Sequence, residues 1–176
     1  MSAQPDAAVP IAVRPARPDE LAAAAEVAVT AFADLGRHLA PDERKKLYAR
    51  VRASTSEPDP AVVLVAVTGP EERVVGSIVY DGPEGGRHPL FPKGWSFFRS
   101  VGVDPAWRSR GVGRQLVEAC LERARTEKAD WLALYAADVN ETALHLYKAM
   151  GFREVGDAPS YWGVRYRVYG YDLSAN

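Results

Sequence analysis

Short apolar runs alternate with longer amphipathic segments along nearly the whole chain. The run at 61–68 is continuously apolar, which is typical of a strand buried on both faces, and Gly69-Pro70 predicts a hairpin turn after it. Runs of this kind, bounded by glycine, proline or charged residues, predict strands at 11–14, 61–68, 74–80, 95–103, 131–136, 152–155 and 165–173.

The segments between these runs have the periodicity of helices. In the first segment one apolar stripe is formed by Leu21, Ala24, Ala25, Ala28 and Phe32, and Gly36 ends or interrupts it. Helices are therefore expected at 18–36, 41–54, 111–128 and 140–150. Strands that alternate with helices predict an α/β sandwich around a mixed sheet.

Size and charge favour one globular domain. The chain has 176 residues, of which 47% are apolar and 26% charged, and its formal net charge is −1. We expect a single domain at 11–174, and the near-zero charge gives no support for broad binding to nucleic acid or to a membrane. Residues 1–10 are rich in alanine and proline and lack an apolar core, so we expect a flexible tail there rather than a signal peptide or membrane anchor.

The single cysteine, Cys120, excludes an internal disulfide and fits a reducing, cytoplasmic location. It falls on the apolar face of the helix expected at 111–128, so we interpret it as a core residue. No spacing typical of zinc ligands is found, and no metal is expected.

A basic, glycine-containing loop follows the strand expected at 95–103. Two glycines let a ligand approach the backbone, and free N–H groups at the start of a helix favour an anion. A phosphate site is one interpretation and a tight turn fringed by arginine is the other. The Lys-Ser/Thr pair of a P-loop is absent, and Leu116 stands where a dinucleotide fingerprint needs its third glycine. The loop and the residue after it are Arg108, Ser109, Arg110, Gly111, Val112, Gly113 and Arg114.

Two blocks of this region resemble the GCN5-related N-acetyltransferases, the GNAT superfamily. The first is the Arg-x-x-Gly-x-Gly loop after a Val-Asp-Pro strand end. The second, at 140–152, resembles the family signature Asn-x-x-Ala-x-x-Leu-Tyr-x-x-x-Gly-Phe. The two blocks lie in the expected order and at the expected distance. The close resemblance covers 95–155, and the earlier part matches only as a pattern of elements.

The resemblance implies a GNAT-like sandwich: a mixed, mostly antiparallel sheet with two splayed parallel strands, flanked by about four helices. It implies acetyl-CoA as donor and an amine as acceptor. Tyr147 matches the family's general acid, and Asn140, an apt helix N-cap, would also contact the cofactor arm. The other cofactor-binding residues that it implies are Val101, Gly102 and Val103 on the strand and Arg108, Ser109, Arg110, Gly111, Val112, Gly113 and Arg114 in the loop.

A general base is not evident. The strands at 95–103 and 131–136 carry no carboxylate where family members have one. An acceptor amine of low pKa would need no strong base. The candidates are Asp138, Tyr135, Glu26, Asp81 and His88. The long loop at 81–94 is either a substrate lid or a disordered insert.

The acceptor is the open question. A small-molecule amine is the leading hypothesis because four aromatic residues, Tyr161, Trp162, Phe91 and Trp95, suggest an aromatic-walled pocket. A protein or peptide amine is an alternative within the same chemistry. A non-catalytic acyl-CoA-binding module is an alternative of another class, and a nucleotide-phosphate enzyme is a third. A homodimer is expected by analogy with the family.

Overall fold

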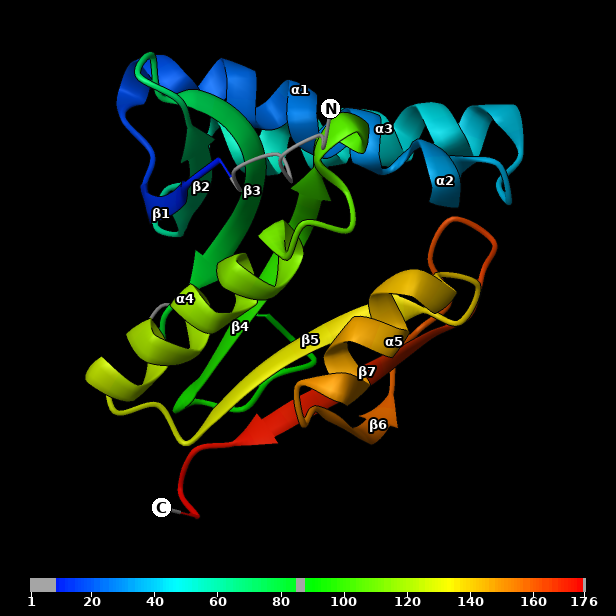
Figure 1. The fold of residues 1–176 in the computed structure, drawn as a ribbon. Helices are drawn as coiled ribbons and strands as arrows, with labels where there is room; N and C mark the ends of the chain where they lie inside the picture. The colour runs from blue at the N-terminus through cyan, green and yellow to red at the C-terminus, as the bar shows by residue number, and fades with distance from the viewer. Residues whose placement is uncertain (1–8, 85–87, 176) are drawn as a thin grey trace, which may run out of the picture.

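A seven-stranded mixed sheet forms the centre of the molecule (Figure 1). The computed structural model describes residues 9–84 and 88–175. Neighbouring strands are antiparallel except β4 and β5, and their order is β1-β2-β3-β4-β5-β7-β6. The strands are β1 (Ile11–Pro15), β2 (Val62–Thr68), β3 (Arg73–Asp81), β4 (Trp95–Val103), β5 (Trp131–Ala137), β6 (Arg153–Asp157) and β7 (Tyr166–Asp172).

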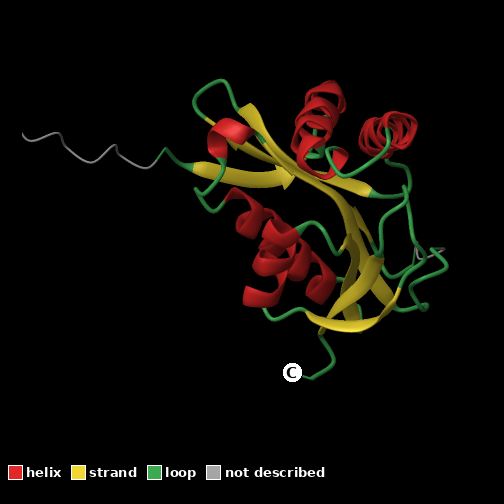
Figure 2. Cartoon of the chain, turned by 90° about the vertical axis from the view of Figure 1, so that its right-hand side faces the viewer, coloured by secondary structure: helices red, strands yellow, loops and turns green. Residues whose placement is uncertain are grey.

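Helices cover both faces of this sheet (Figure 2). On one face, α1 (Leu21–Ala31) contacts β3, β4 and α3 (Pro41–Ser56), and the short α2 (Ala33–Gly36) joins them. On the other face lie α4 (Val112–Thr126) and α5 (Glu141–Ala149). We call these the α1–α3 face and the α4–α5 face. The arrangement confirms the predicted sandwich, with five α-helices in the described ranges where about four were expected.

The parallel strands β4 and β5 pair only at their beginnings. Their register holds for three residue pairs, of which Phe97 opposite Ala133 is the last. Beyond that pair the strands diverge, as Figure 1 shows. The two splayed parallel strands expected from the resemblance are therefore present.

A β-bulge on β4 accompanies the divergence. Ser77 of β3 lies opposite Gly102 and Val79 lies opposite Arg99, so β4 contains one residue more than β3 between these pairs. Ser100 lies in the bulge with φ +53°, in the left-handed region. A bulge bends its strand and increases the local twist, which directs the end of β4 away from β5.

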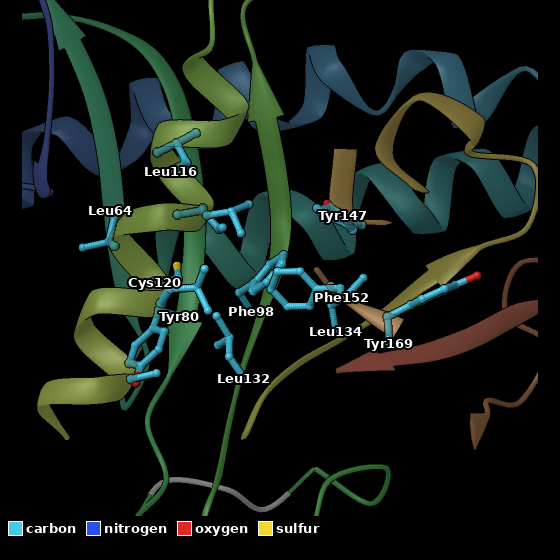
Figure 3. Packing of buried hydrophobic residues seen from close by; sticks show 14 of the residues in the cluster. Leu64, Tyr80, Phe98, Leu116, Cys120, Leu132, Leu134, Tyr147, Phe152 and Tyr169 are labelled. Atoms are coloured by element: carbon cyan, nitrogen blue, oxygen red, sulfur yellow. The ribbon is translucent and has the colours of Figure 1, made fainter. Parts of the chain in front are cut away.

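The main core lies between the sheet and the helices α4 and α5 (Figure 3). One face of α4 contributes Leu116, Val117 and Cys120, each fully buried. Cys120 is therefore a core residue, as predicted, and burial raises the pKa of its thiol. The rings of Phe98 and Phe152 pack edge to face at 5.9 Å between their centroids, which ties β4 to the start of β6.

The first predicted helix is divided into three shorter elements. The segment expected to be one helix at 18–36 consists of a 3₁₀ turn (Pro18–Glu20), α1 and α2. The Glu20 carboxylate accepts a hydrogen bond from the Arg17 N–H at 2.7 Å and pairs with Arg14 at 2.7 Å. These contacts, which periodicity does not reveal, hold the turn in place before α1 begins.

Two sequence expectations fall partly outside the described residues. Only residues 9 and 10 of the tail expected at 1–10 are described, and residues 85–87 of the loop at 81–94 are not. The described end of that loop packs on the sheet, with Phe91 buried against Phe97 at 4.6 Å between ring centroids. Within the described ranges, no helix has the length and apolar character needed to cross a membrane.

Candidate active site

A cleft of about 910 Å³ opens where β4 and β5 diverge. It reaches both faces of the sheet, because its walls include residues of α1 and α2 as well as of α4 and α5. The divergence thus opens the sheet itself. The residues that line the cleft include Phe32, Leu35, His38, Phe98, Arg99, Ser100, Val101, Val103, Trp107, Arg108, Ser109, Gly111, Val112, Gly113, Arg114, Leu134, Tyr135, Asn140, His145, Tyr147 and Tyr166.

The glycine loop places the start of α4 at one end of this cleft. Gly111 has φ +78°, and a Cβ built there would meet no atom within 4 Å. The Gln115 N–H donates a hydrogen bond to the Gly111 carbonyl at 3.0 Å, which is the first bond of the helix. The N–H groups of Val112, Gly113 and Arg114 come before it in the chain. Such groups have no partner within the helix, and the helix dipole adds partial positive charge to them. The loop therefore has the glycine turn and the helix start that the sequence predicted, and its role as an anion site stays a prediction.

The three arginines of the loop are exposed and have different neighbours. Arg108 pairs with Asp34 of α2 at 3.0 Å, which links the loop to the α1–α3 face. The Arg110 guanidinium lies 4.9 Å from the centre of the Trp107 ring. Arg110 is not among the residues that line the cleft, whereas Arg108 and Arg114 are. A phosphate bound in the cleft would therefore contact Arg108 and Arg114 rather than Arg110.

The three predicted residues at the end of β4 face different ways. Val101 and Val103 line the cleft and pack against the main core on the α4–α5 face. Gly102 faces α1: a Cβ there would lie 2.7 Å from the Cα of Ala28 and 3.1 Å from the carbonyl oxygen of Val27. Gly102 therefore packs closely against α1, and it does not line the cleft.

Asn140 and Tyr147 lie at the start and near the end of α5, and both line the cleft. Asn140 occupies the N-cap position, but its side chain forms no capping hydrogen bond. Tyr147 is 5% exposed and packs against Phe98 at 5.6 Å between ring centroids (Figure 3). Burial raises the pKa of its phenol, so the hydroxyl keeps its proton at neutral pH.

Two of the candidate bases are held by arginines outside the cleft. The exposed Glu26 carboxylate accepts a hydrogen bond from Arg52 at 2.9 Å, and this bond lowers its pKa. Asp138 accepts one from Arg167 at 3.1 Å. Neither carboxylate lines the cleft.

The other three candidates lie on the α1–α3 side of the sheet. Asp81 is buried and forms an ion pair with Arg99. The Nδ1 atom of His88 accepts a hydrogen bond from the Leu90 N–H at 3.2 Å, so neutral His88 carries its proton on Nε2. Burial, and then a nearby positive charge, lower the pKa of His88. Of the five candidates, Tyr135 alone lines the cleft, and burial raises the pKa of its phenol.

The aromatic wall exists, but with other members than the four expected. Trp95 stacks on Trp131 at 5.0 Å, at the closed end of the parallel pair. Phe91 is buried beneath the sheet, and Tyr161 and Trp162 pack in the cluster under α1 and α3 without lining the cleft. The aromatic residues that do line it are Phe32, Phe98, Trp107, Tyr135, Tyr147 and Tyr166.

Arg99 is the residue that sequence reasoning missed. It lines the cleft, its side chain is 26% exposed, and it is the single charged residue of β4. A charge within an otherwise apolar strand is rare without a partner or a role, so this signal was available in the sequence.

Comparison with known proteins gives short matches in sequence and long ones in fold. N-alpha-acetyltransferase RimI of Mycobacterium tuberculosis is 40% identical over 73 residues, 42% of this chain and 42% of that protein. Mycothiol acetyltransferase of Nocardiopsis dassonvillei is 44% identical over 52 residues, 30% of this chain and 16% of that protein. The chain thus spans less than half the length of these two relatives.

The solved structure of yncA, a putative acetyltransferase from Salmonella typhimurium, shares the fold, with a TM-score of 0.64 at 18% identity over 94% of this chain and 95% of that one. The model of the Acetyltransferase (GNAT) family matches residues 26–152, which include both diverging strands, the glycine loop and α5. Because the match spans most of the chain, the chain belongs to the Acetyltransferase (GNAT) family.

Proposed function

We propose that this chain is an acetyl-CoA-dependent N-acetyltransferase that acts on an amine of a small molecule. The observation that carries the proposal is the cleft between β4 and β5, which joins the N-terminus of α4 to a buried tyrosine. The structure of yncA was solved with its cofactor acetyl-CoA, which supports the same donor here. A thioester bound between the strands would be reachable by an amine from the α1–α3 face.

We assign the donor to the α4–α5 side of the cleft, here called the donor side. The loop N–H groups around Gly111, with Arg108 and Arg114, would hold the pyrophosphate. The backbone of Val101 and Val103 and the free side chain of Asn140 would hold the pantetheine arm. Gly102 and Arg110 would not contact acetyl-CoA in this proposal. Gly102 packs against α1 instead, and Arg110 lies over the Trp107 ring.

Tyr147 would act on the leaving group. In the reaction the amine nitrogen attacks the thioester carbonyl, the carbon–sulfur bond breaks, and the sulfur gains a proton. A thiol near pKa ~8.5 leaves as a thiolate unless a donor stands beside it. Tyr147 lines the cleft and its hydroxyl keeps its proton, which suits it to donate to that sulfur.

A small acceptor is favoured by the size of the cleft. Its volume of about 910 Å³ lies within the range of small-molecule sites, and it must also take the donor's arm. The mycothiol acetyltransferase relative points towards a small acceptor, whereas the name of RimI denotes an N-alpha-acetyltransferase. A protein N-terminus is therefore the second candidate, and a non-catalytic acyl-CoA-binding module is the third.

Thermal stabilisation by acetyl-CoA tests the proposal. A ligand at ~100 times its Kd should stabilise the wild type by roughly 2.7 kcal/mol. Gly111→Glu should abolish the shift, because it places a carboxylate and a strained residue in the anion seat. Gly69→Glu is the matched control, since Gly69 has φ +74° and equally open space but lies in the β2–β3 turn.

CoA release in the presence of amines then separates the candidates. Release with small amines supports the proposal, and release with peptides alone supports the second candidate. Binding without release on any amine indicates the non-catalytic module. Absence of a shift in the wild type would overturn acetyl-CoA as donor. The single domain at 11–174, the cytoplasmic location and the homodimer stay predictions.

A further inference from the structure

Two side chains stand immediately beyond the point where β4 and β5 separate. Phe97 and Ala133 form the last parallel pair, and Arg99 and Tyr135 each follow two residues later. Because side chains alternate along a strand, Arg99 shares a face with Phe97, and Tyr135 shares one with Ala133. Both line the cleft, and both lie on the α1–α3 face, where the acceptor would enter.

Two neighbouring side chains hold Arg99 in place. Its guanidinium forms an ion pair with Asp81, which is 7% exposed at the end of β3, and lies 5.8 Å from the centre of the Phe97 ring. Burial, with a further contribution from Arg50, lowers the pKa of Arg99, but an arginine stays charged at neutral pH. Among the described residues its guanidinium forms no further ion pair, so N–H groups remain for a ligand in the cleft.

A second arginine approaches from α3. The hydroxyls of Ser54 and Ser100 lie 2.9 Å apart, which fixes α3 against the bulge next to Arg99. Arg50 stands one turn before Ser54 and therefore on the same face of the helix. The charge of Arg50 lowers the pKa of His88, and it opposes the rise that burial causes in the pKa of Tyr135. In the described part of the chain, no carboxylate lies within ion-pair distance of Arg50.

The charges at this point are unbalanced. Of the carboxylates that the structure describes, Asp81 alone pairs with either guanidinium group, and its partner is Arg99. A purely cationic amine would be repelled here, whereas an oxyanion in the cleft would meet the Arg99 guanidinium, whose fork geometry suits it. Arg50 does not itself line the cleft, but it is exposed on α3 and its charge acts on Arg99, His88 and Tyr135. Phe32 and Tyr166 add aromatic surface to the same cleft.

We propose that the acceptor amine carries an oxyanion, a carboxylate or a phosphonate, and that Arg50 and Arg99 bind this group on the α1–α3 face. This assignment rests on the proposed function. It also bears on the missing base, because nearby positive charge favours the neutral form of a bound amine. Arg50 and Arg99 would then be specificity-determining residues, and Asp81 a positioning residue for Arg99.

A series of ligands with one side chain tests the charge. L-phenylalanine, its phosphonate analogue, phenylalaninamide and phenethylamine differ only at the group that the arginines would hold. Their binding to the CoA-saturated protein is measured by calorimetry. Phenylalanine or the phosphonate should bind at least about 10-fold more tightly than the two analogues that lack an oxyanion, as expected for hydrogen bonds to an ionised group. The stronger of the two identifies the oxyanion.

Two glutamine variants on α3 locate the effect. Arg50→Gln should remove most of the preference for the anionic ligand and leave phenethylamine binding unchanged. Arg52→Gln, on the same helix but paired with Glu26, should retain the preference. Equal binding of the whole series, or no binding, would overturn the assignment, as would preference for phenylalaninamide or for a peptide with an N-terminal phenylalanine.

Turnover of the same ligands separates this inference from the proposed function. If the anionic ligands bind preferentially but none releases CoA from acetyl-CoA, the oxyanion site stands and the transferase function falls. If CoA release is rapid and equal for amines with and without the oxyanion, the transferase function stands and the oxyanion site falls.

Discussion

The donor side of the cleft comes from one continuous stretch of chain, from Val101 to Tyr147, and includes the backbone N–H groups at the start of α4. The α1–α3 side, which we call the acceptor side, combines α1, α3, the end of β3, Arg99 of β4 and β5. Its polar groups are side chains such as Arg50 and Arg99. The donor side can therefore stay the same while the acceptor side changes, since a few substitutions on separate elements would alter its charge.

The two sides should also respond differently to mutation. A change in the glycine loop alters a site that is exposed and locally folded, so it should affect binding before stability. A change on the acceptor side disturbs contacts between α1, α3 and the sheet, so stability and specificity should respond together. The three predictions that follow test this difference.

The largest effect is expected at Gly102, where β4 packs against α1. Gly102→Ala would place its Cβ 2.7 Å from the Cα of Ala28, and backbone cannot move aside as a side chain can. We expect a loss of about 2–3 kcal/mol in the free energy of unfolding, measured by denaturant titration. Gly156→Ala on β6 is the control, because nothing lies within 4 Å of the added atom. Equal stability of the two variants would show that α1 does not pack closely on Gly102.

A smaller, catalytic effect is expected on the donor side. Tyr147→Phe should lower kcat at least ~10-fold, equivalent to about 1.4 kcal/mol, because it removes the proton donor while keeping the ring. The affinity for acetyl-CoA should change little. Tyr169→Phe makes the same chemical change in the same core outside the cleft and should leave kcat as it is. A wild-type kcat in the Tyr147 variant, at saturating acetyl-CoA, would remove this residue from the mechanism.

The smallest effect on stability is expected at Asn140. An N-cap replacement usually costs about 1 kcal/mol, but the Asn140 side chain forms no capping bond, so Asn140→Ala should change the free energy of unfolding by less than ~0.5 kcal/mol. Acetyl-CoA binding should weaken about 3- to 10-fold. Asp104→Ala is the contrast, since Asp104 accepts the Ala106 N–H at 2.9 Å and should cost about 1 kcal/mol. A comparable loss in both variants would restore Asn140 to a capping role.

Most elements of the fold follow from the apolar pattern. The strand at 95–103 has the predicted bounds, and α4 is shorter than predicted by a residue or two at each end. Strands buried on both faces and helices with one apolar stripe have periodicities that a single sequence displays. The first helix was the exception, because a contact between Glu20 and Arg14, six residues apart, decides where it begins.

The candidate site was predictable on one side only. The sequence indicated the loop residues that border the cleft and the position of Tyr147 on α5, because both depend on local backbone geometry. It did not indicate that Phe91 lies under the sheet or that Trp95 stacks on Trp131 at the closed end. Aromatic residues satisfy the same local pattern wherever they pack, so their place depends on contacts with distant elements.

The sequence by itself determined the turn at the start of α4: a glycine with φ +78° and the backbone N–H groups of the first helical turn behind it. These features need only a few consecutive residues. The tertiary structure alone decided the cleft and its charge, since the bulge at Ser100 parts β4 from β5 and the Ser54 contact brings α3 beside Arg99. The Ser54–Ser100 contact joins residues 46 positions apart, and no local pattern specifies it.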